Sequence, residues 1–182
     1  MALFRLLSTG PTSEILHQNR AQIQLKARDN ARTPLQWDDS PHGGFTQPTV
    51  TPWMRANPDY AICNAANQID DGDSVYHYWA QCLALRREYK DVLVYGTFRL
   101  IDEEHVAIFA YEKRLHGRRA VVVLNWSSGA TEWYVPTNAR PVIKHGTLLQ
   151  SNYSRGRLGL VDGKLTLEPW EAVVVFEEGS LL

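Results

Sequence analysis

The sequence has few cysteines and no long apolar run. Of its 182 residues only two are cysteines, Cys63 and Cys82, which is too few for a disulfide scaffold. Neither lies at a metal-ligand spacing from the histidines. A membrane-spanning helix needs about 20 apolar residues, and no apolar stretch of this sequence approaches that length. The first residues of the chain are mildly apolar, but Arg5 interrupts them. We therefore expect reduced cysteines, no metal, no cofactor, no membrane association and a cytoplasmic location.

The sequence also lacks an excess of positive or negative charge. The chain carries 20 acidic and 19 basic residues, a formal net charge of -1, and has no long-range field that would attract nucleic acid. Hydrophobic residues make up 44% of the sequence, which is ordinary for a globular protein with a core. We therefore expect a folded protein without a nucleic-acid partner.

What the sequence does contain is an unusual polar stretch at residues 27–39, ARDNARTPLQWDD. Pro34 biases Thr33 toward an extended conformation and stops a helix arriving from upstream, so we predict an ordered loop. The guanidinium groups of Arg28 and Arg32 suit carboxylates or the vicinal hydroxyls of a sugar. A salt-bridged surface turn is the alternative.

Further strings extend this pattern: HGGF at residues 42–45, PW at 52–53 and NPDY at 57–60. Together they closely resemble the α-glucosidases and oligo-1,6-glucosidases of glycoside hydrolase family 13, and a looser similarity runs from about residue 21 to about residue 178. The resemblance implies a loop that lies late in a (β/α)8 barrel and lines a sugar pocket. It implies α-linked glucose oligosaccharides as partners, in the full-length context.

The resemblance suggests three residues for substrate binding. Arg28 matches an arginine that the family places in the pocket for the non-reducing glucose, where it would reach sugar hydroxyls or orient a catalytic aspartate. Arg32 is a weaker candidate that could instead brace the loop. Trp37 could stack on the apolar face of a pyranose ring or be buried beneath the loop.

The sequence lacks the two motifs that carry catalytic carboxylates in this family. A retaining glycosidase holds a nucleophile and an acid/base about 5–5.5 Å apart, but neither the family's Arg-x-Asp motif nor its Asn-His-Asp string occurs here. In TFRLID, residues 97–102, Arg99 and Asp102 are three positions apart and would face opposite sides of a strand. We assign no catalytic residue.

The organisation of the chain changes after residue 90. Residues 13–26 and about 74–90 show amphipathic helical patterns, and the second resembles the last helix of the barrel. Short segments rich in β-branched and aromatic residues then recur, separated by turn residues; they span 92–101, 106–114, 119–127, 131–136, 141–150, 165–170 and 172–178. This spacing predicts an antiparallel β-sandwich over residues 91–182.

The predicted fold is therefore mixed. Residues 1–90 would form an incomplete C-terminal piece of a (β/α)8 barrel, since a whole barrel needs about 250 residues, and the β-sandwich would follow. We expect the chain to be the C-terminal portion of an α-glucosidase that is not catalytic alone. A non-catalytic carbohydrate-binding or interaction module is the alternative, and uncovered barrel surface could promote self-association.

Overall fold

The computed structural model describes residues 32–179. Their backbone forms two compact units, which divide between Ser74 and Val75 and are described separately below. The helix predicted at residues 13–26 lies outside the described residues, as does Arg28. The predicted boundary after residue 90 stays a prediction.

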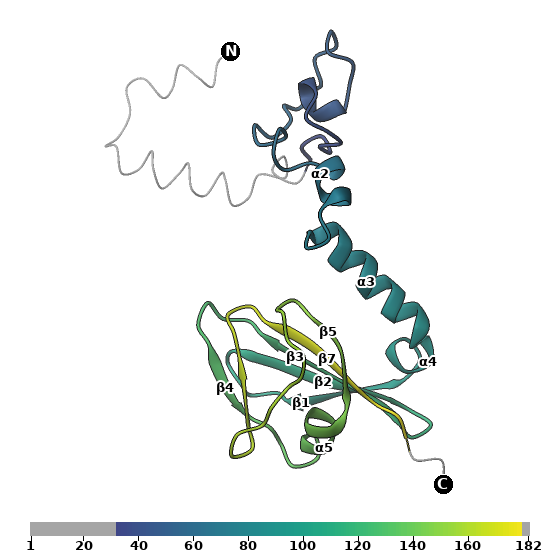
Figure 1. The fold of residues 1–182 in the computed structure, drawn as a ribbon, viewed down its shortest axis with the longest axis vertical. Coiled ribbons are helices and arrows are strands. Elements are labelled where there is room, and N and C mark those ends of the chain that lie inside the picture. Colours follow the sequence, from purple (N-terminus) through teal and green to yellow (C-terminus); the bar gives the residue numbers. More distant parts are fainter. Residues whose placement is uncertain (1–31, 180–182) are drawn as a thin grey trace, which may run out of the picture. The chain divides into compact units, whose positions relative to one another are not determined.

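The first unit consists mainly of loops (Figure 1). Its regular elements are a 3₁₀-helix, η3 (Pro41–Gly44), and a short α-helix, α2 (Ala65–Asp70). The scarcity of helices and strands agrees with the sequence, where proline, glycine, asparagine and aspartate are frequent.

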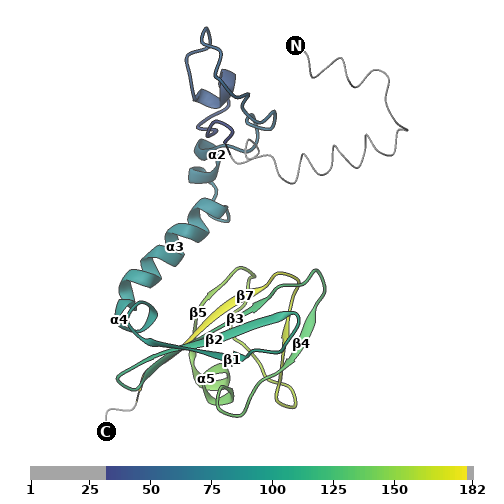
Figure 2. The ribbon, with the colours of Figure 1, turned by 180° about the vertical axis from the view of Figure 1, so that it is seen from behind.

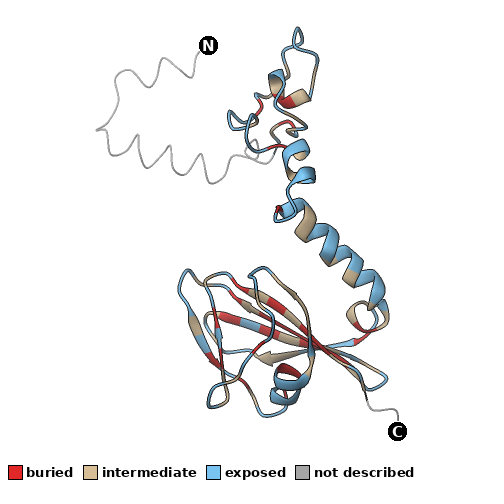
Figure 3. Cartoon of the chain, viewed as in Figure 1, coloured by how far each residue is buried: buried red, intermediate tan, exposed pale blue. Residues whose placement is uncertain are grey.

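The second unit begins with two helices, α3 (Val75–Glu88) and α4 (Lys90–Leu93). Tyr78, Cys82 and Leu85 form a half-buried stripe along α3, which the helical spacing predicts. No residue of α3 is fully buried, and this helix is largely exposed in Figure 3. Burial raises the pKa of Tyr78, and the neighbouring Cys82 raises it further.

Two antiparallel sheets follow. The larger has the strand order β1-β2-β3-β7-β5 (Figure 2). The smaller pairs β4 with β6. The strands are β1 (Thr97–Asp102), β2 (Ile108–Leu115), β3 (Arg118–Asn125), β4 (Thr131–Tyr134), β5 (Thr147–Ser151), β6 (Lys164–Leu167) and β7 (Ala172–Glu177). The prediction of antiparallel strands is confirmed.

The main core lies where one face of the larger sheet meets the smaller sheet and α5 (Arg140–His145). Alternate residues of the central strands point into it, as the two-residue period of a strand requires. Its buried members include Val121 and Val123 from β3, Val173 and Val175 from β7, and Trp133 from β4. A smaller cluster of Val92, Ala120 and Phe176 joins α4 to the strands.

Two predicted strand segments are partly wrong. Residues 141–145 belong to α5, because Pro141 occupies the start of the helix, where its fixed φ and missing N–H are tolerated. Val142 and Ile143 are then buried from the helix. Val92 and Leu93 belong to α4, and the N–H of Gly96 closes this turn on the carbonyl of Val92 at 3.0 Å.

A buried carboxylate ties three parts of the larger sheet together. Glu112 accepts from Arg99 Nε at 2.7 Å and also bonds to Arg119, whose side chain is itself buried. Arg119 donates onward to the carbonyl of Asn138 at 2.7 Å. Burial alone would raise the pKa of Glu112, but the two arginines outweigh it and hold this pKa below the ordinary glutamate value.

Across the described range, residues 32–179, the helices are all too short or too polar to span a lipid bilayer.

Candidate functional site

The described part of the sequence-predicted loop closes into a tight turn at residues 37–43. The N–H groups of Trp37 and Asp38 donate to the carbonyl of Gly43 at 2.7 and 3.3 Å, and the N–H of Gly43 donates to Ser40 at 2.8 Å. The loop is therefore ordered by its own backbone, as expected from the sequence.

The side chain of Asp38 fixes the inside of this turn. Its carboxylate accepts from the hydroxyl of Ser40 and from the N–H of Ser40, the latter at 2.9 Å. These bonds, the hydroxyl first, lower the pKa of Asp38. Asp38 is therefore committed to the turn rather than presented as a general acid.

The HGGF string supplies backbone conformations that the turn needs. His42, Gly43 and Gly44 all have positive φ, at 62°, 66° and 67°. A Cβ atom on Gly44 would lie 2.6 Å from the carboxylate of Asp38. Glycine at position 44 thus avoids both left-handed strain and a collision.

We expect Gly44→Ala to open the turn locally. The strained φ and the collision with Asp38 together should cost on the order of 1–3 kcal/mol, so the Trp37 amide should exchange with solvent about 5- to 150-fold faster, as measured by hydrogen exchange. Gly72→Ala is the matched control, because nothing lies within 4 Å of its added Cβ. Equal exchange in both variants would contradict this account of the turn.

Gln36 and Asn64 attach the loop to α2. Gln36 Nε2 donates to Asp59 at 3.0 Å and to the carbonyl of Cys63 at 2.6 Å. The carbonyls of Gln36 and Trp37 accept the N–H groups of Ala65 and Ala66, both at 2.9 Å. The buried Asn64 caps the helix by accepting from Asn67 N–H at 2.8 Å.

This anchoring presents aromatic side chains to solvent. Trp37 is 52% exposed and Trp53 is 72% exposed, and Phe45 is exposed as well. The described residues therefore leave about half of the Trp37 side chain exposed, and stacking on a sugar and burial beneath the loop both stay open. Arg32 is exposed too, while Arg28 lies outside the described residues. The binding roles of Arg28, Arg32 and Trp37 stay predictions.

The segment TFRLID, which contains an arginine and an aspartate but not the family's motif, forms β1. Arg99 and Asp102 in this strand have different partners. Arg99 pairs with Glu112, whereas Asp102 accepts from the indole N–H of Trp133 at 3.0 Å. A turn follows this strand, since β1 ends at Asp102 and β2 starts at Ile108. These contacts satisfy core groups of the sheet.

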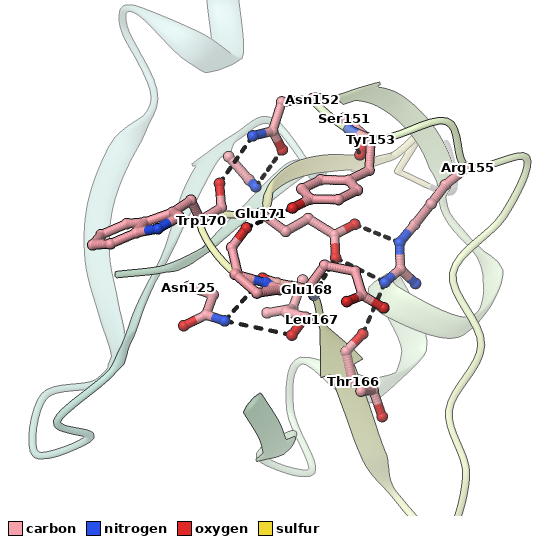
Figure 4. Close-up of polar contacts among 12 residues, drawn as sticks. Asn125, Ser151, Asn152, Tyr153, Arg155, Thr166, Leu167, Glu168, Trp170 and Glu171 are labelled. Carbon is pink, nitrogen blue, oxygen red and sulfur yellow. Dashed lines mark hydrogen bonds and ion pairs between the residues drawn. The ribbon is translucent and has the colours of Figure 1, made fainter. Parts of the chain in front are cut away.

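A second buried carboxylate, Glu171, was not singled out from the sequence (Figure 4). Its side chain is fully buried and accepts from Arg155 Nη2 and from the N–H of Glu168, both at 2.7 Å. Arg155 Nε forms an ion pair with the other carboxylate oxygen. Glu171 thus joins the chain after β5 to the end of β6, which is a structural role.

Within residues 32–179, histidine, cysteine and acidic side chains do not gather in threes that could hold a metal ion. Cys63 and Cys82 are both free thiols.

Comparison with known proteins identifies the family that the loop suggested. Residues 8–96 match the profile described as "Alpha amylase, catalytic domain", and this match ends one residue before β1. The resemblance to the alpha-amylase family is confirmed.

Curated members of the alpha-amylase family are similar over most of the chain. An α-glucosidase of Schizosaccharomyces pombe is 37% identical over 93% of this chain, and an oligo-1,6-glucosidase of Halalkalibacterium halodurans is 39% identical over 85%. The chain spans 28% and 26% of the length of these relatives.

Solved structures of similar enzymes agree. A mutant of the trehalulose synthase MutB in complex with Tris matches with a TM-score of 0.76 and 33% identity, covering 92% of this chain and 28% of that one. A mutant isomaltulose synthase of Erwinia rhapontici in complex with its natural substrate sucrose matches with a TM-score of 0.71 and 31% identity. It covers 82% of this chain and 25% of that one.

Proposed function

We propose that this chain is the C-terminal part of a retaining α-glucosidase that hydrolyses α-glucosidic bonds in oligosaccharides of the maltose and isomaltose type. The observation that carries the proposal is the 27–39 loop, within a chain 37% identical to an α-glucosidase and 39% identical to an oligo-1,6-glucosidase. In this proposal residues 91–182 are the β-sandwich that follows the barrel.

The loop would form one side of a sugar pocket. Arg28 would hold substrate hydroxyls or orient a carboxylate, and Trp37 has the exposure that stacking on a sugar ring requires. The turn closed by Gly43 and the anchoring of Gln36 to α2 support the described half of this loop, since a binding residue must be held in one orientation.

The catalytic carboxylates would lie in a part of the barrel that this sequence does not encode. We therefore expect the purified chain to show no turnover of 4-nitrophenyl α-glucoside above the buffer rate. Release of nitrophenol that survives repeated purification would contradict this expectation.

A chimera tests the function itself. Residues 8–179 would replace the aligned part of the Schizosaccharomyces pombe α-glucosidase, and the product should hydrolyse maltose or isomaltose. Arg28→Ala should then lower kcat/KM by about 10- to 150-fold, because a hydrogen bond to a charged group is worth about 1.5–3 kcal/mol.

Arg55→Ala, at an exposed arginine with no assigned role, serves as the matched control in the chimera and should change kcat/KM much less. A folded chimera without activity, or equal effects of both substitutions, would overturn the proposed role of the loop.

A further inference from the structure

A shallow hollow in the second unit lies at the turn between β1 and β2. Its volume is about 170 Å³, which is small for a drug-sized ligand but suited to a single sugar ring. The residues that matter for its chemistry are Asp102, Glu103, His105, Phe109 and Trp126.

An exposed tryptophan forms one wall of this hollow. Trp126 is 63% exposed, although its main chain is fixed, with its N–H donating to the carbonyl of Ala107 at 2.7 Å. Phe109 adds a second exposed ring. A solvent-facing indole offers the flat apolar surface that the apolar face of a pyranose ring contacts.

A second tryptophan at the same end of the sheet is held outward at a conformational cost. Trp170 is 56% exposed and has φ at +58°, a left-handed conformation that bulky residues rarely adopt. Its N–H donates to Ser127, the neighbour of Trp126, and its carbonyl accepts from Asn152. Its indole points away from the Glu171–Arg155 pair (Figure 4). These two hydrogen bonds hold the strained backbone of Trp170 in place, although Trp170 is not among the residues that line the hollow.

The polar side of the hollow has defined donors and acceptors. His105 Nδ1 accepts the N–H groups of Ala107 and Ile108 at 3.2 and 2.9 Å, so the ring hydrogen lies on Nε2, which can donate. Asp102 uses Oδ2 for the indole of Trp133 at 3.0 Å, and Oδ1 can accept from a ligand. Glu103 adds a further acceptor carboxylate.

The polar groups and aromatic rings of the hollow together indicate which class of ligand it would bind. Two carboxylates disfavour an anion, whereas hydroxyl groups can donate to both carboxylates and accept from the imidazole. We propose that Trp126, Asp102 and His105 form a binding site for one neutral pyranose ring of an oligosaccharide. No residue of the 27–39 loop belongs to this site. If the second unit is a carbohydrate-binding module, this hollow is where it would bind the sugar.

Titration of the full chain with maltotriose, followed by amide and indole NMR spectra, tests the site. The signals of the Ala107 and Ile108 amides and of the Trp126 indole should shift with a single saturable curve. Trp126→Ala should weaken this binding at least about tenfold, because the stacking wall is removed. Asp102→Asn and His105→Phe should weaken it as well, in variants with unchanged circular dichroism.

A matched control separates this site from exposed aromatic surface elsewhere. Trp53→Ala removes a comparably exposed indole from the other unit and should not change the maltotriose curve. Shifts confined to residues 32–74, or undiminished binding by Trp126→Ala, would overturn the proposal. Saturation by choline without any response to maltotriose would also overturn it, because the hollow would then bind an organic cation.

Discussion

Glu112→Gln is expected to destabilise the second unit by about 3–5 kcal/mol. The substitution keeps the shape of the side chain but leaves the buried guanidinium of Arg119 without its counter-charge, and an uncompensated buried charge has a cost of this size. Urea denaturation followed by circular dichroism measures the loss. Replacing both partners, with Glu112→Leu and Arg119→Met, should recover most of the lost stability.

The pH dependence of the same variant provides an independent check. The pKa of Glu112 is lowered in the folded protein, so its contribution to stability is present above the ordinary glutamate pKa and is lost as the pH falls through the folded value. Glu112→Gln should therefore lose less stability than the wild type between about pH 5 and pH 3. Glu132→Gln breaks the exposed pair with Lys164 and should cost much less than Glu112→Gln, because solvent screens this pair. Similar costs for the two variants would contradict the role of burial.

Glu171→Ala is expected to have the second large effect, about 3–5 kcal/mol. It removes the carboxylate that Arg155 and the Glu168 N–H share, and each group left without its partner contributes to the cost. The amide of Glu168 should lose its protection from hydrogen exchange by more than the global destabilisation explains, because its acceptor is gone.

Glu178→Ala is the control for Glu171, because it removes an exposed carboxylate that is also paired with an arginine, Arg118. It should cost about 0–1 kcal/mol. If the Glu168 amide stays protected in Glu171→Ala, another acceptor replaces the carboxylate and this assignment of the contact is wrong.

Much of the second unit could be predicted from the sequence, because its strands have alternating patterns and clear turn residues. An antiparallel strand lies in each segment where one was expected, although the first residues of two of these segments are helical. The segment PVIKH was misassigned because β-branched residues are equally compatible with a short buried helix. The proline at its start was the signal that favoured the helix.

The site was harder to predict, because contacts distant in sequence determine it. The arginine-rich loop could be recognised as a string, but the bond from Gln36 to Cys63 and the cap from Asn64 to Asn67 depend on how that loop folds. Likewise, TFRLID could be dismissed as a catalytic motif on spacing alone. No local pattern, however, could indicate that Asp102 and Trp126 line one hollow.

The irregular outer strands of the larger sheet affect how the protein behaves at high concentration. β1 and β5 are its two edges, and the pairing of each with its neighbour shifts register, between Leu100 and Asp102 in one and between Leu148 and Gln150 in the other. Such bulges twist an edge and interrupt its ladder of free backbone groups, so a further strand cannot add in continuous register. Growth of this sheet into fibrils is therefore hindered at both edges, and precipitates that form at high concentration should lack cross-β order.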